Sequence, residues 1–247
     1  MLKDKVTLIT GAAAGIGEGT AHLFAELGAL VYILDRNAAG GAAVAEAIRA
    51  KGGAAFSFET DVTRPDTIRP AVEDALQRFG RIDVLINNAG IYPRRAFLDM
   101  TEAEWDQMHE IHLKGLFHCS KLVVPHMVEQ RSGKIINISS VTFFKGMANL
   151  SHYVAAKGGI IGFTRSLARE MGPYQVYVNC ITPGAILVES EKLVATPEQM
   201  AEIVKQQCLE RRLGPLDIAR VCVFLASQWS DGMTGQTLNV DGGLVMY

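Results

Sequence analysis

The sequence predicts an α/β fold: one doubly wound, Rossmann-like parallel sheet with helices on both faces, in a single domain spanning residues 1–247. Along the whole chain, short runs of β-branched and aliphatic residues alternate with longer segments whose apolar residues recur at helical spacing. The first strand leads directly into a glycine-rich turn and a helix. No repeat, low-complexity block or Pro/Ser-rich linker divides the 247 residues, so we expect one α/β unit.

The first strand, Val6–Thr10, is followed by the turn GAAAGIG at residues 11–17 and by an alanine-rich helix that ends near Leu27. Glycine lets the backbone approach a pyrophosphate, and the N-terminus of a helix carries unpaired N–H groups that favour an anion. The turn therefore predicts a dinucleotide site, although its spacing differs from the commoner G-x-G-x-x-G. Its predicted cofactor contacts are Gly11, Gly15, Ile16 and Gly17.

The second strand, Leu30–Asp35, ends on a carboxylate eighteen residues after Gly17. An acidic side chain at that place accepts hydrogen bonds from the adenosine ribose and repels a 2′-phosphate. Arg36 would act in the opposite sense, but we interpret it as a solvated surface residue. The turn residues at 12–14 are all alanine and offer a phosphate no cation. The sequence therefore predicts NAD rather than NADP.

The alternation of helices and strands continues with a helix over Ala38–Lys51, a strand over Ala54–Phe58, a helix that ends near Phe79, and a strand over Ile82–Ile86. This fourth strand leads into NNAG at residues 87–90. Small residues at the end of a strand let the chain pass close to a ligand, so we expect NNAG to line the site.

The segment Thr101–Gln130 is predicted to be mostly helical, and its first residues, Thr-x-x-Glu, have the pattern of a capping box. Three histidines fall in this segment: His109, His112 and His118. Only the first two have the spacing of one helix face, and no acidic third ligand is evident. We therefore expect no metal site.

Tyr153 and Lys157 are four residues apart in a predicted helix, so their side chains share one face. A cation beside a tyrosine favours the phenolate and lowers the pKa from its ordinary value of about 10. The pair would then exchange a proton with a substrate hydroxyl near neutral pH. Ser140 closes the apolar strand Lys134–Ser140, and ligands of parallel sheets bind where strands end.

With this Ser, Tyr and Lys, the turn TGAAAGIG and the motif NNAG, the sequence resembles the short-chain dehydrogenase/reductase family over its whole length. The resemblance implies hydride transfer between a secondary alcohol, or a cyclic hemiacetal, and C4 of a nicotinamide. It also implies that Tyr153 takes the hydroxyl proton, Lys157 holds the nicotinamide ribose and Ser140 bonds the reacting oxygen. The further cofactor contacts that it implies are Asp61, Val62, Asn88, Ala89, Gly90, Tyr153, Lys157, Pro183 and Gly184.

Two positions depart from the pattern of the family. His112 stands where the family has an asparagine that holds a water linking the lysine to solvent. We expect either that His112 serves this proton path or that it is a packed histidine bonded to a backbone carbonyl. The Lys157 cation would keep it neutral at pH 7. Val188 replaces a threonine that usually bonds the carboxamide of nicotinamide, a contact that Ser190 or a backbone group would then supply.

After Lys157 the helix continues to Met171 with three glycines, at 158, 159 and 162. Each costs about 1 kcal/mol relative to alanine, so another surface is expected to come close. In the family this helix faces a second subunit, and the resemblance implies a homotetramer. A strand over Tyr177–Ile181, a helix over Leu216–Ala226 and a strand over Thr237–Val240 complete the predicted fold.

The substrate prediction rests on short segments near the Tyr and Lys. Thr142–Arg165 resembles bacterial pyridoxal 4-dehydrogenases, and NNAGIYP with TGQTLNVDGG resembles secondary aromatic alcohol dehydrogenases. Both resemblances imply that a cyclic or aromatic alcohol is oxidised with NAD. We expect residues 185–213 to form a lid that excludes water, or else a surface helical hairpin. The predicted substrate contacts are Tyr92, Phe143, Phe144, Met147 and His152, of which the two phenylalanines could equally be core residues.

Two other functions remain open. A 3-oxoacyl-carrier-protein reductase is the alternative within the family, against which Asp35 and the lack of a basic patch argue. A nucleotide-binding protein without turnover is the alternative from another class, and only His112 and Val188 favour it. The net charge of −2 makes nucleic acid and anionic membranes poor partners. Four cysteines without a CxxC pattern, and no signal peptide, predict a cytoplasmic protein.

Overall fold

The computed structural model describes residues 1–188 and 196–246, and it confirms the predicted fold class. Within these residues, every pairing between neighbouring strands of the sheet is parallel. The strands are β1 (Val6–Thr10), β2 (Leu30–Asp35), β3 (Ala54–Glu59), β4 (Val84–Asn87), β5 (Gly133–Ile138), β6 (Val176–Pro183) and β7 (Thr237–Val240). Their order in the sheet is β3-β2-β1-β4-β5-β6-β7.

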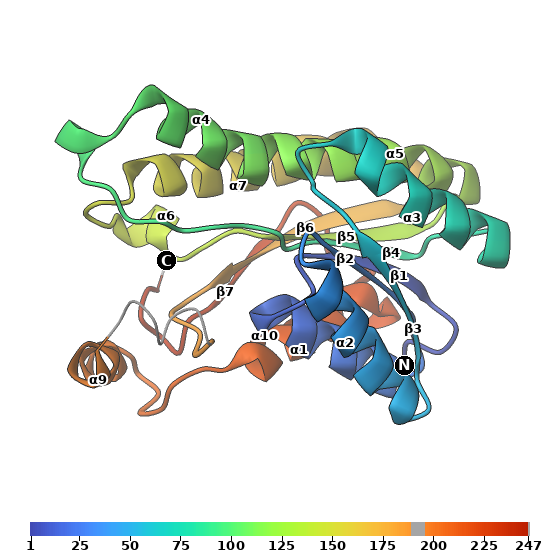
Figure 1. The fold of residues 1–247 in the computed structure, drawn as a ribbon, viewed down its shortest axis with the longest axis horizontal. Helices are drawn as coiled ribbons and strands as arrows, with labels where there is room; N and C mark the ends of the chain where they lie inside the picture. Colours follow the sequence, from blue (N-terminus) through green and yellow to red (C-terminus); the bar gives the residue numbers. More distant parts are fainter. Residues whose placement is uncertain (189–195, 247) are drawn as a thin grey trace.

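Helices cover both faces of the sheet, as Figure 1 shows. On one face lie α1 (Gly15–Glu26), α2 (Ala38–Ala50) and α10 (Pro215–Ala226). On the other face lie α3 (Pro65–Phe79), α5 (Gly115–Gln130) and α7 (Ser151–Met171). The remaining helical elements are η1 (Phe97–Asp99), α4 (Glu102–His109), η2 (Glu110–Lys114), α6 (Thr142–Lys145), η3 (Gly172–Tyr174), α9 (Pro197–Lys205) and η4 (Gln228–Ser230).

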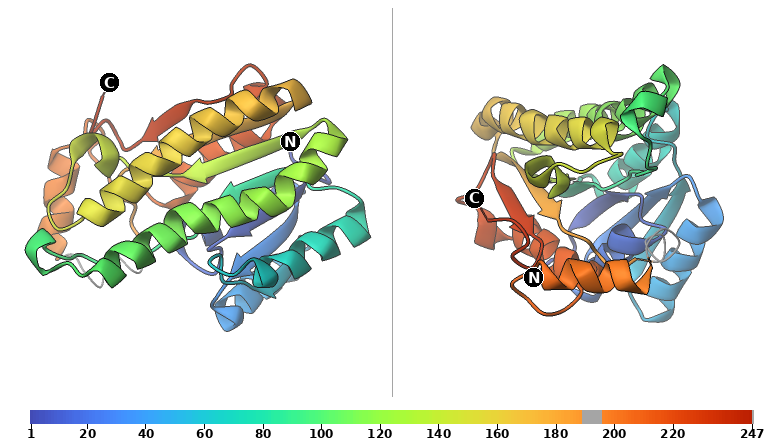
Figure 2. Two further views of the ribbon diagram at one scale, coloured as in Figure 1. Left: turned by 90° about the horizontal axis from the view of Figure 1, so that it is seen from above. Right: turned by 90° about the vertical axis from the view of Figure 1, so that its left-hand side faces the viewer.

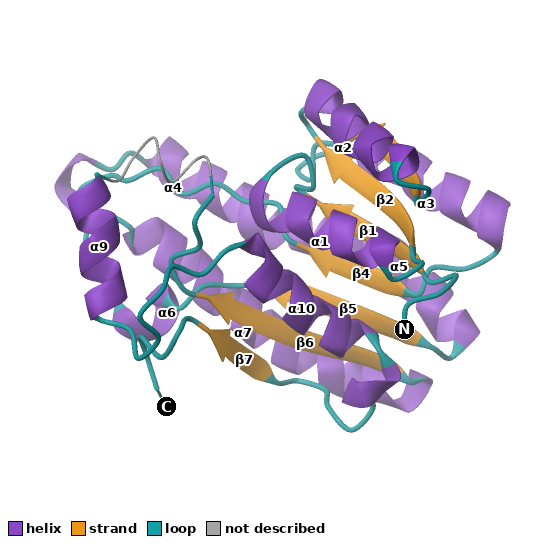
Figure 3. Ribbon diagram, turned by 90° about the horizontal axis from the view of Figure 1, so that it is seen from below, coloured by secondary structure: helices purple, strands orange, loops and turns teal. Residues whose placement is uncertain are grey.

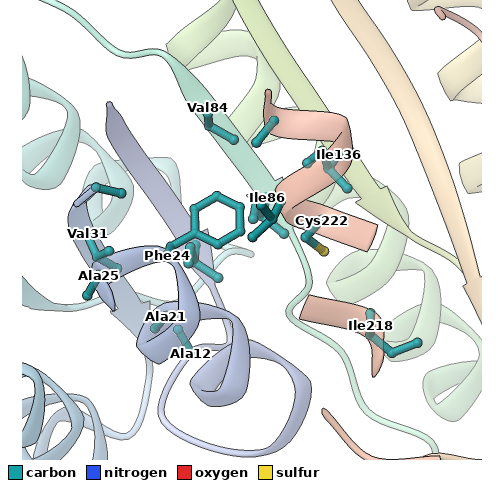
Figure 4. Packing of buried hydrophobic residues seen from close by; sticks show 14 of the residues in the cluster. Ala12, Ala21, Phe24, Ala25, Val31, Val84, Ile86, Ile136, Ile218 and Cys222 are labelled. Atoms are coloured by element: carbon teal, nitrogen blue, oxygen red, sulfur yellow. The ribbon is translucent and has the colours of Figure 1, made fainter. Parts of the chain in front are cut away.

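The hydrophobic core lies in two layers, one between each set of helices and the sheet. In the layer seen from below in Figure 3, the fully buried ring of Phe24 on α1 lies against the sheet beside Ile86, with Cys222 of α10 close by (Figure 4). None of the helices in the described ranges is long and apolar enough to cross a membrane.

The strand order places the site. Chain connections run outward in both directions from β1 and β4, so these strands form the switch point of the sheet. The chain segments that follow β1 and β4 diverge at the carboxyl ends of these strands, and an opening lies between them. The glycine turn follows β1, and NNAG begins at the last residue of β4. Both motifs therefore meet at one edge of the sheet.

The long helix predicted over Thr101–Gln130 is interrupted. Its capping box is confirmed, because Thr101 and Glu104 exchange side-chain and backbone hydrogen bonds. Between α4 and α5, however, η2 is a π-helical turn that contains His112. Such turns are frequent at functional sites.

The glycines of α7 receive close neighbours from within the chain. A Cβ at Gly158 would lie 2.7 Å from the Phe143 ring, and one at Gly159 would lie 2.9 Å from Leu113. Gly162 is exposed and has no such neighbour within 4 Å. Internal packing therefore explains two of the three glycines, and a second subunit is needed for neither.

Asp83 is a buried carboxylate that joins the beginnings of β1 and β4. It is 4% exposed and accepts hydrogen bonds from Lys5 Nζ at 2.9 Å and from the Val6 N–H at 3.0 Å. Arg81 donates a further bond from Nε at 3.0 Å. Removal of the carboxylate would leave these donors without an acceptor next to the core.

We expect Asp83→Ala to lower the free energy of unfolding by about 2 kcal/mol, because the buried Val6 N–H loses its acceptor and two half-exposed cations lose their carboxylate. Urea denaturation measures this value. The control is Asp66→Ala, since Asp66 pairs with Arg64 at the surface, where a pair contributes at most about 1 kcal/mol. Equal losses in the two variants would show that Asp83 is not a buried anchor.

Candidate active site

A cleft of about 1000 Å³ follows the carboxyl edge of the sheet. Its walls include residues that end six strands or follow them within two positions, namely Gly11, Asp35, Asp61, Asn88, Ser140 and Gly184. It extends from Asp35 at one end to Tyr153 and Lys157 on α7. The cleft is thus long enough to join the predicted cofactor and catalytic residues in one site.

The glycine turn and NNAG hold each other in place. Gly11 has a positive φ of 64°, and a Cβ there would lie 2.7 Å from Ala89 Cα. Asn88 donates from Nδ2 to the carbonyls of Thr10 and Gly11, each at 2.9 Å. No side chain caps the N-terminus of α1. A pyrophosphate therefore fits against this turn, where backbone N–H groups can meet it.

Asp35 lies at the adenosine end of the cleft with its carboxylate already oriented. Its two oxygens accept hydrogen bonds from the backbone N–H groups of Ala13 and Asn37, both at 2.9 Å. Asp61 lines the same end, and burial raises its pKa, but hydrogen bonds from Thr63 and the charge of Arg36 bring the pKa below its ordinary value. Arg36 is therefore close enough to Asp61 to act on its charge.

The Ser140 hydroxyl lies close enough to the Tyr153 phenol to lower its pKa. Ser140 Oγ accepts from the Thr142 N–H at 3.2 Å and from the Thr142 hydroxyl at 2.9 Å. With these two donors on its oxygen, Ser140 directs its own hydrogen to another partner. Burial raises the pKa of Tyr153 to about 12, although the neighbouring Ser140 acts against this.

Lys157 is buried at 4% exposure, with its ammonium 5.4 Å from the centre of the Tyr153 ring. Its Nζ donates a hydrogen bond to the Ile138 carbonyl at 2.8 Å. Burial lowers the pKa of Lys157 to about 8. Desolvation raises the pKa of Tyr153 in the cofactor-free protein, and the lowering by Lys157 that the sequence predicts stays a prediction.

His112 lies beside this pair, with its ring edge-on to Tyr153 and 5.4 Å between the ring centres. Its Nε2 is 2.7 Å from the Ile91 carbonyl oxygen. Burial, followed by the charge of Lys157, lowers the pKa of His112 to about 3. His112 is therefore neutral at pH 7, as the sequence predicts.

The predicted substrate residues divide into two groups. Tyr92 and Met147 line the cleft. Phe143, Phe144 and His152 do not lie among the residues that line it. Phe143 packs over Gly158, Phe144 packs on a hydrophobic cluster, and His152 is 1% exposed.

The described part of residues 185–213 forms one wall of the cleft. A bridge between Ile186 and Leu213, with a hydrogen bond of 2.8 Å from Leu187 N to Leu213 O, joins the two ends of the segment. Figures 1 and 2 show α9 at the end of the molecule where α4 and α6 also lie. Val188 lines the cleft near Gly15, whereas Ser190 lies outside the described residues.

Sequence reasoning missed several residues of the cleft wall. They come from segments without a motif, and among them are Leu150, Gln206 and Leu244. In the sequence, the one feature that indicates a contact for Leu244 is the apolar segment at residues 244–247 to which it belongs. Among the described residues no group of three His, Cys, Asp or Glu could hold a metal; His109 and His118 instead bond backbone carbonyls of Trp105 and Val62.

Comparison with known proteins gives a family for this geometry. The model of the family described as enoyl-(acyl carrier protein) reductase matches residues 11–245. A 3-oxoacyl-[acyl-carrier-protein] reductase of Thermotoga maritima is 39% identical over 246 residues, 99% of each chain. A probable galactose dehydrogenase of Rhizobium meliloti is 38% identical over 245 residues, 98% of this chain and 96% of that protein. A 3-oxoacyl-[acyl-carrier-protein] reductase of Chlamydia pneumoniae is 40% identical over 243 residues, 98% of each chain.

The chain belongs to the short-chain dehydrogenase/reductase family. It is therefore an oxidoreductase that uses a nicotinamide cofactor, and the glycine turn, Asp35 and the long cleft fit a dinucleotide. The relatives reported above differ in their named substrates, so family membership leaves the substrate open.

Lys157→Met tests whether the buried ammonium lowers stability in the cofactor-free protein. Below about pH 8 the folded and unfolded states both carry the charge, and folding must bury it. As the pH rises from about 8 to 10.5, the unfolded state binds more protons than the folded state, so wild type gains stability relative to the variant. We expect the variant to be at least as stable as wild type at pH 7 and to lose that advantage by pH 10.5. Urea titrations across this range measure the difference, and a difference independent of pH would contradict the assignment.

Proposed function

We propose that the protein reduces a ketone to a secondary alcohol with NADH, using Ser140, Tyr153 and Lys157 as its catalytic residues. The observation that carries this proposal is that Ser140, Tyr153 and Lys157 line the same cleft as the glycine turn and Asp35, with the Lys157 ammonium 5.4 Å from the centre of the Tyr153 ring. When bound, the nicotinamide supplies or accepts the hydride at C4.

In this proposal the residues of the chain handle the substrate oxygen and its proton. The Tyr153 phenol, whose pKa is about 12, is protonated at neutral pH and can donate to a carbonyl oxygen. Ser140 hydrogen-bonds the same oxygen and orients it. The Lys157 ammonium stabilises negative charge that develops on the phenol as the proton leaves. Ketone reduction is the direction that the reductase relatives name.

A 3-oxoacyl thioester is the substrate class that we propose first. This replaces the ring-bearing alcohol expected from sequence, because several relatives that cover the whole chain are named 3-oxoacyl-carrier-protein reductases. The apolar wall that includes Met147, Leu150 and Ile203 suits an acyl chain. A cyclic alcohol or hemiacetal remains the second candidate, supported by the galactose dehydrogenase relative and by Tyr92 at the cleft. The specific likeness to pyridoxal 4-dehydrogenase stays a hypothesis within it.

Assembly and location remain proposals as well. Part of α7 is exposed and carries no large side chain at Ala155 and Gly162. Such a surface suits close contact between copies of the chain in a homotetramer. We propose a cytoplasmic location on the four free cysteines, which a reducing compartment preserves. Residues 185–213 are proposed to close over the substrate as a lid, on the evidence of the cleft wall that α9 provides.

The substrate proposal predicts a higher kcat/KM for reduction of an acetoacetyl thioester than for oxidation of D-galactose or a secondary aromatic alcohol. NADH absorbance measures all three reactions. We expect Tyr153→Phe to lower kcat/KM by roughly 10²- to 10⁴-fold, since it removes the proton donor. Tyr174→Phe, at an exposed residue of η3, is the matched control. Faster galactose oxidation would favour the second candidate, and nucleotide binding without any turnover would favour a non-catalytic role.

The cofactor proposal predicts that NADH binds at least about tenfold more tightly than NADPH, because a 2′-phosphate would meet the Asp35 carboxylate. Calorimetric titration with both nucleotides measures the ratio. Asp35→Ser should reduce the preference. Glu59→Ser, which removes an exposed carboxylate paired in register with Asp35 on β3, should leave it unchanged. Tighter binding of NADPH by wild type would show that Arg36 dominates.

A further inference from the structure

Behind the catalytic residues, Asn87 at the end of β4 has its side chain oriented by neighbours. It is 6% exposed, and its Nδ2 donates to Asn137 Oδ1 at 2.9 Å and to Ser120 Oγ at 3.4 Å. Asn137 in turn donates from its Nδ2 to Thr164 Oγ1 at 2.9 Å. This chain of bonds determines which side of the Asn87 amide carries the oxygen. Asn87 Oδ1 is left buried and without a hydrogen-bond partner.

His112 has a second buried polar atom without a hydrogen-bond partner, its Nδ1. Its Nε2 lies 2.7 Å from the Ile91 carbonyl oxygen, and such a contact requires hydrogen on Nε2. The Ile91 N–H is also directed at this nitrogen and would donate to it in the other tautomer, but at 3.2 Å it is the longer contact, and the 2.7 Å approach of the carbonyl decides for hydrogen on Nε2. In a neutral ring with hydrogen on Nε2, Nδ1 is a bare acceptor. Nδ1 is buried and has no hydrogen-bond partner, and the whole residue is 2% exposed.

Asn87 and His112 line the same small pocket between η2, α5 and the carboxyl ends of the strands. Its volume is about 10 Å³, close to what one buried water molecule needs. Thr10 also lines it, but the Thr10 hydroxyl already accepts from the Asn88 and Ala89 N–H groups and lies 3.4 Å from its own acceptor, the Ile86 carbonyl. Among the described residues that line this pocket, Asn87 Oδ1 and His112 Nδ1 are therefore the two buried side-chain oxygen or nitrogen atoms without a partner.

We propose that one internal water molecule binds in this pocket and donates one hydrogen to Asn87 Oδ1 and the other to His112 Nδ1. Water is the ligand that the chemistry selects, since it carries two donors within the volume of the pocket. A metal cation would instead require several charged or neutral ligands, and the pocket lining holds no carboxylate. Burial of unpaired acceptors is costly, so the water stabilises both side chains.

This arrangement makes His112 a positioning residue rather than a proton relay. The water and the Ile91 carbonyl together fix hydrogen on Nε2, and the ring then supports the turn at Gly90 and Ile91. A Cβ at Gly90 would overlap the His112 ring, so the two are in close contact. Tyr92, the next residue, lines the cleft and packs edge-on to Tyr153 with 6.5 Å between ring centres. His112 therefore acts on the substrate side of the cleft through Tyr92.

The charges around His112 are consistent with a ring that stays neutral. Lys157 and His152 face it from α7, His109 faces it from α4, and each would oppose a positive charge on it. Tyr153, also on α7, is a neutral phenol at neutral pH. No carboxylate is among the groups that act on the pKa of His112. A relay that needs imidazolium has no support from these neighbours.

Nitrogen NMR of the cofactor-free protein labelled at histidine tests the proposal without reference to any substrate. We expect the His112 ring, identified by loss of its signals in His112→Gln, to show the Nε2–H tautomer and no titration from pH 5 to pH 9. His126→Asn, on the same face of the sheet at the far end of α5, is the control for assignment. The Nδ1–H tautomer, or titration within this range, would overturn the proposal. Because no turnover is needed, this result is separate from the fate of the proposed function.

A high-resolution crystal structure tests the water itself. Density for one water within about 3.2 Å of both Asn87 Oδ1 and His112 Nδ1 is the expected result. A pocket of well-ordered atoms without such density would refute the water site.

Kinetics test the positioning role and rest on the proposed reductase function. Gln can place an amide donor near the position of Nε2, whereas Asn is too short to reach Ile91. We expect His112→Asn to raise the KM for the ketone by about 3- to 10-fold, the effect of one lost buried hydrogen bond, with little change in kcat. His112→Gln should restore most of this loss, and the acid limb of kcat against pH should be the same in all three proteins. A shifted acid limb in His112→Asn would mean that His112 relays protons.

Discussion

Buried hydrogen bonds at the carboxyl edge of the sheet are the constraint on which the site depends. A parallel sheet ends in backbone groups that have no further strand to pair with, and they must find partners in order to be buried. Here the Thr10 hydroxyl accepts the N–H groups of Asn88 and Ala89, and Asn88 returns bonds to the carbonyls of Thr10 and Gly11. The end of β1 and the end of β4 are thereby locked together, and the walls of the cleft take their positions from them.

Burial then determines the protonation of the groups placed at this edge. Tyr153, Lys157 and His112 are all largely removed from solvent, and each is shifted toward its neutral form. The Lys157 ammonium keeps one strong acceptor, the Ile138 carbonyl. A site that holds a phenol, an amine and an imidazole in this way is suited to donating a proton to a substrate oxygen. Burial of the Lys157 charge costs folding stability, so we expect this residue to favour activity at the expense of stability.

The substrate side of the cleft is built by a different set of segments from those that hold the cofactor. The glycine turn, Asp35 and NNAG lie on or beside strands, whereas Tyr92, Met147 and α9 come from connecting segments. Connections tolerate change more readily than strands do, so one sheet can serve several substrates. Relatives with different substrate names and 38–39% identity are consistent with this division.

The sequence by itself determined the order of the elements, the glycine turn, the carboxylate that ends β2, and the shared helical face of Tyr153 and Lys157. These features depend on local spacing, and the periods of helices and strands translate spacing directly into geometry. Tertiary structure alone decided that Phe143, Phe144 and His152 are not among the residues that line the cleft, that the Tyr153 phenol loses solvent, and that Asn87 and His112 line one small pocket. Each of these outcomes depends on which distant segment covers a side chain, and local spacing in the sequence does not indicate which segment that is.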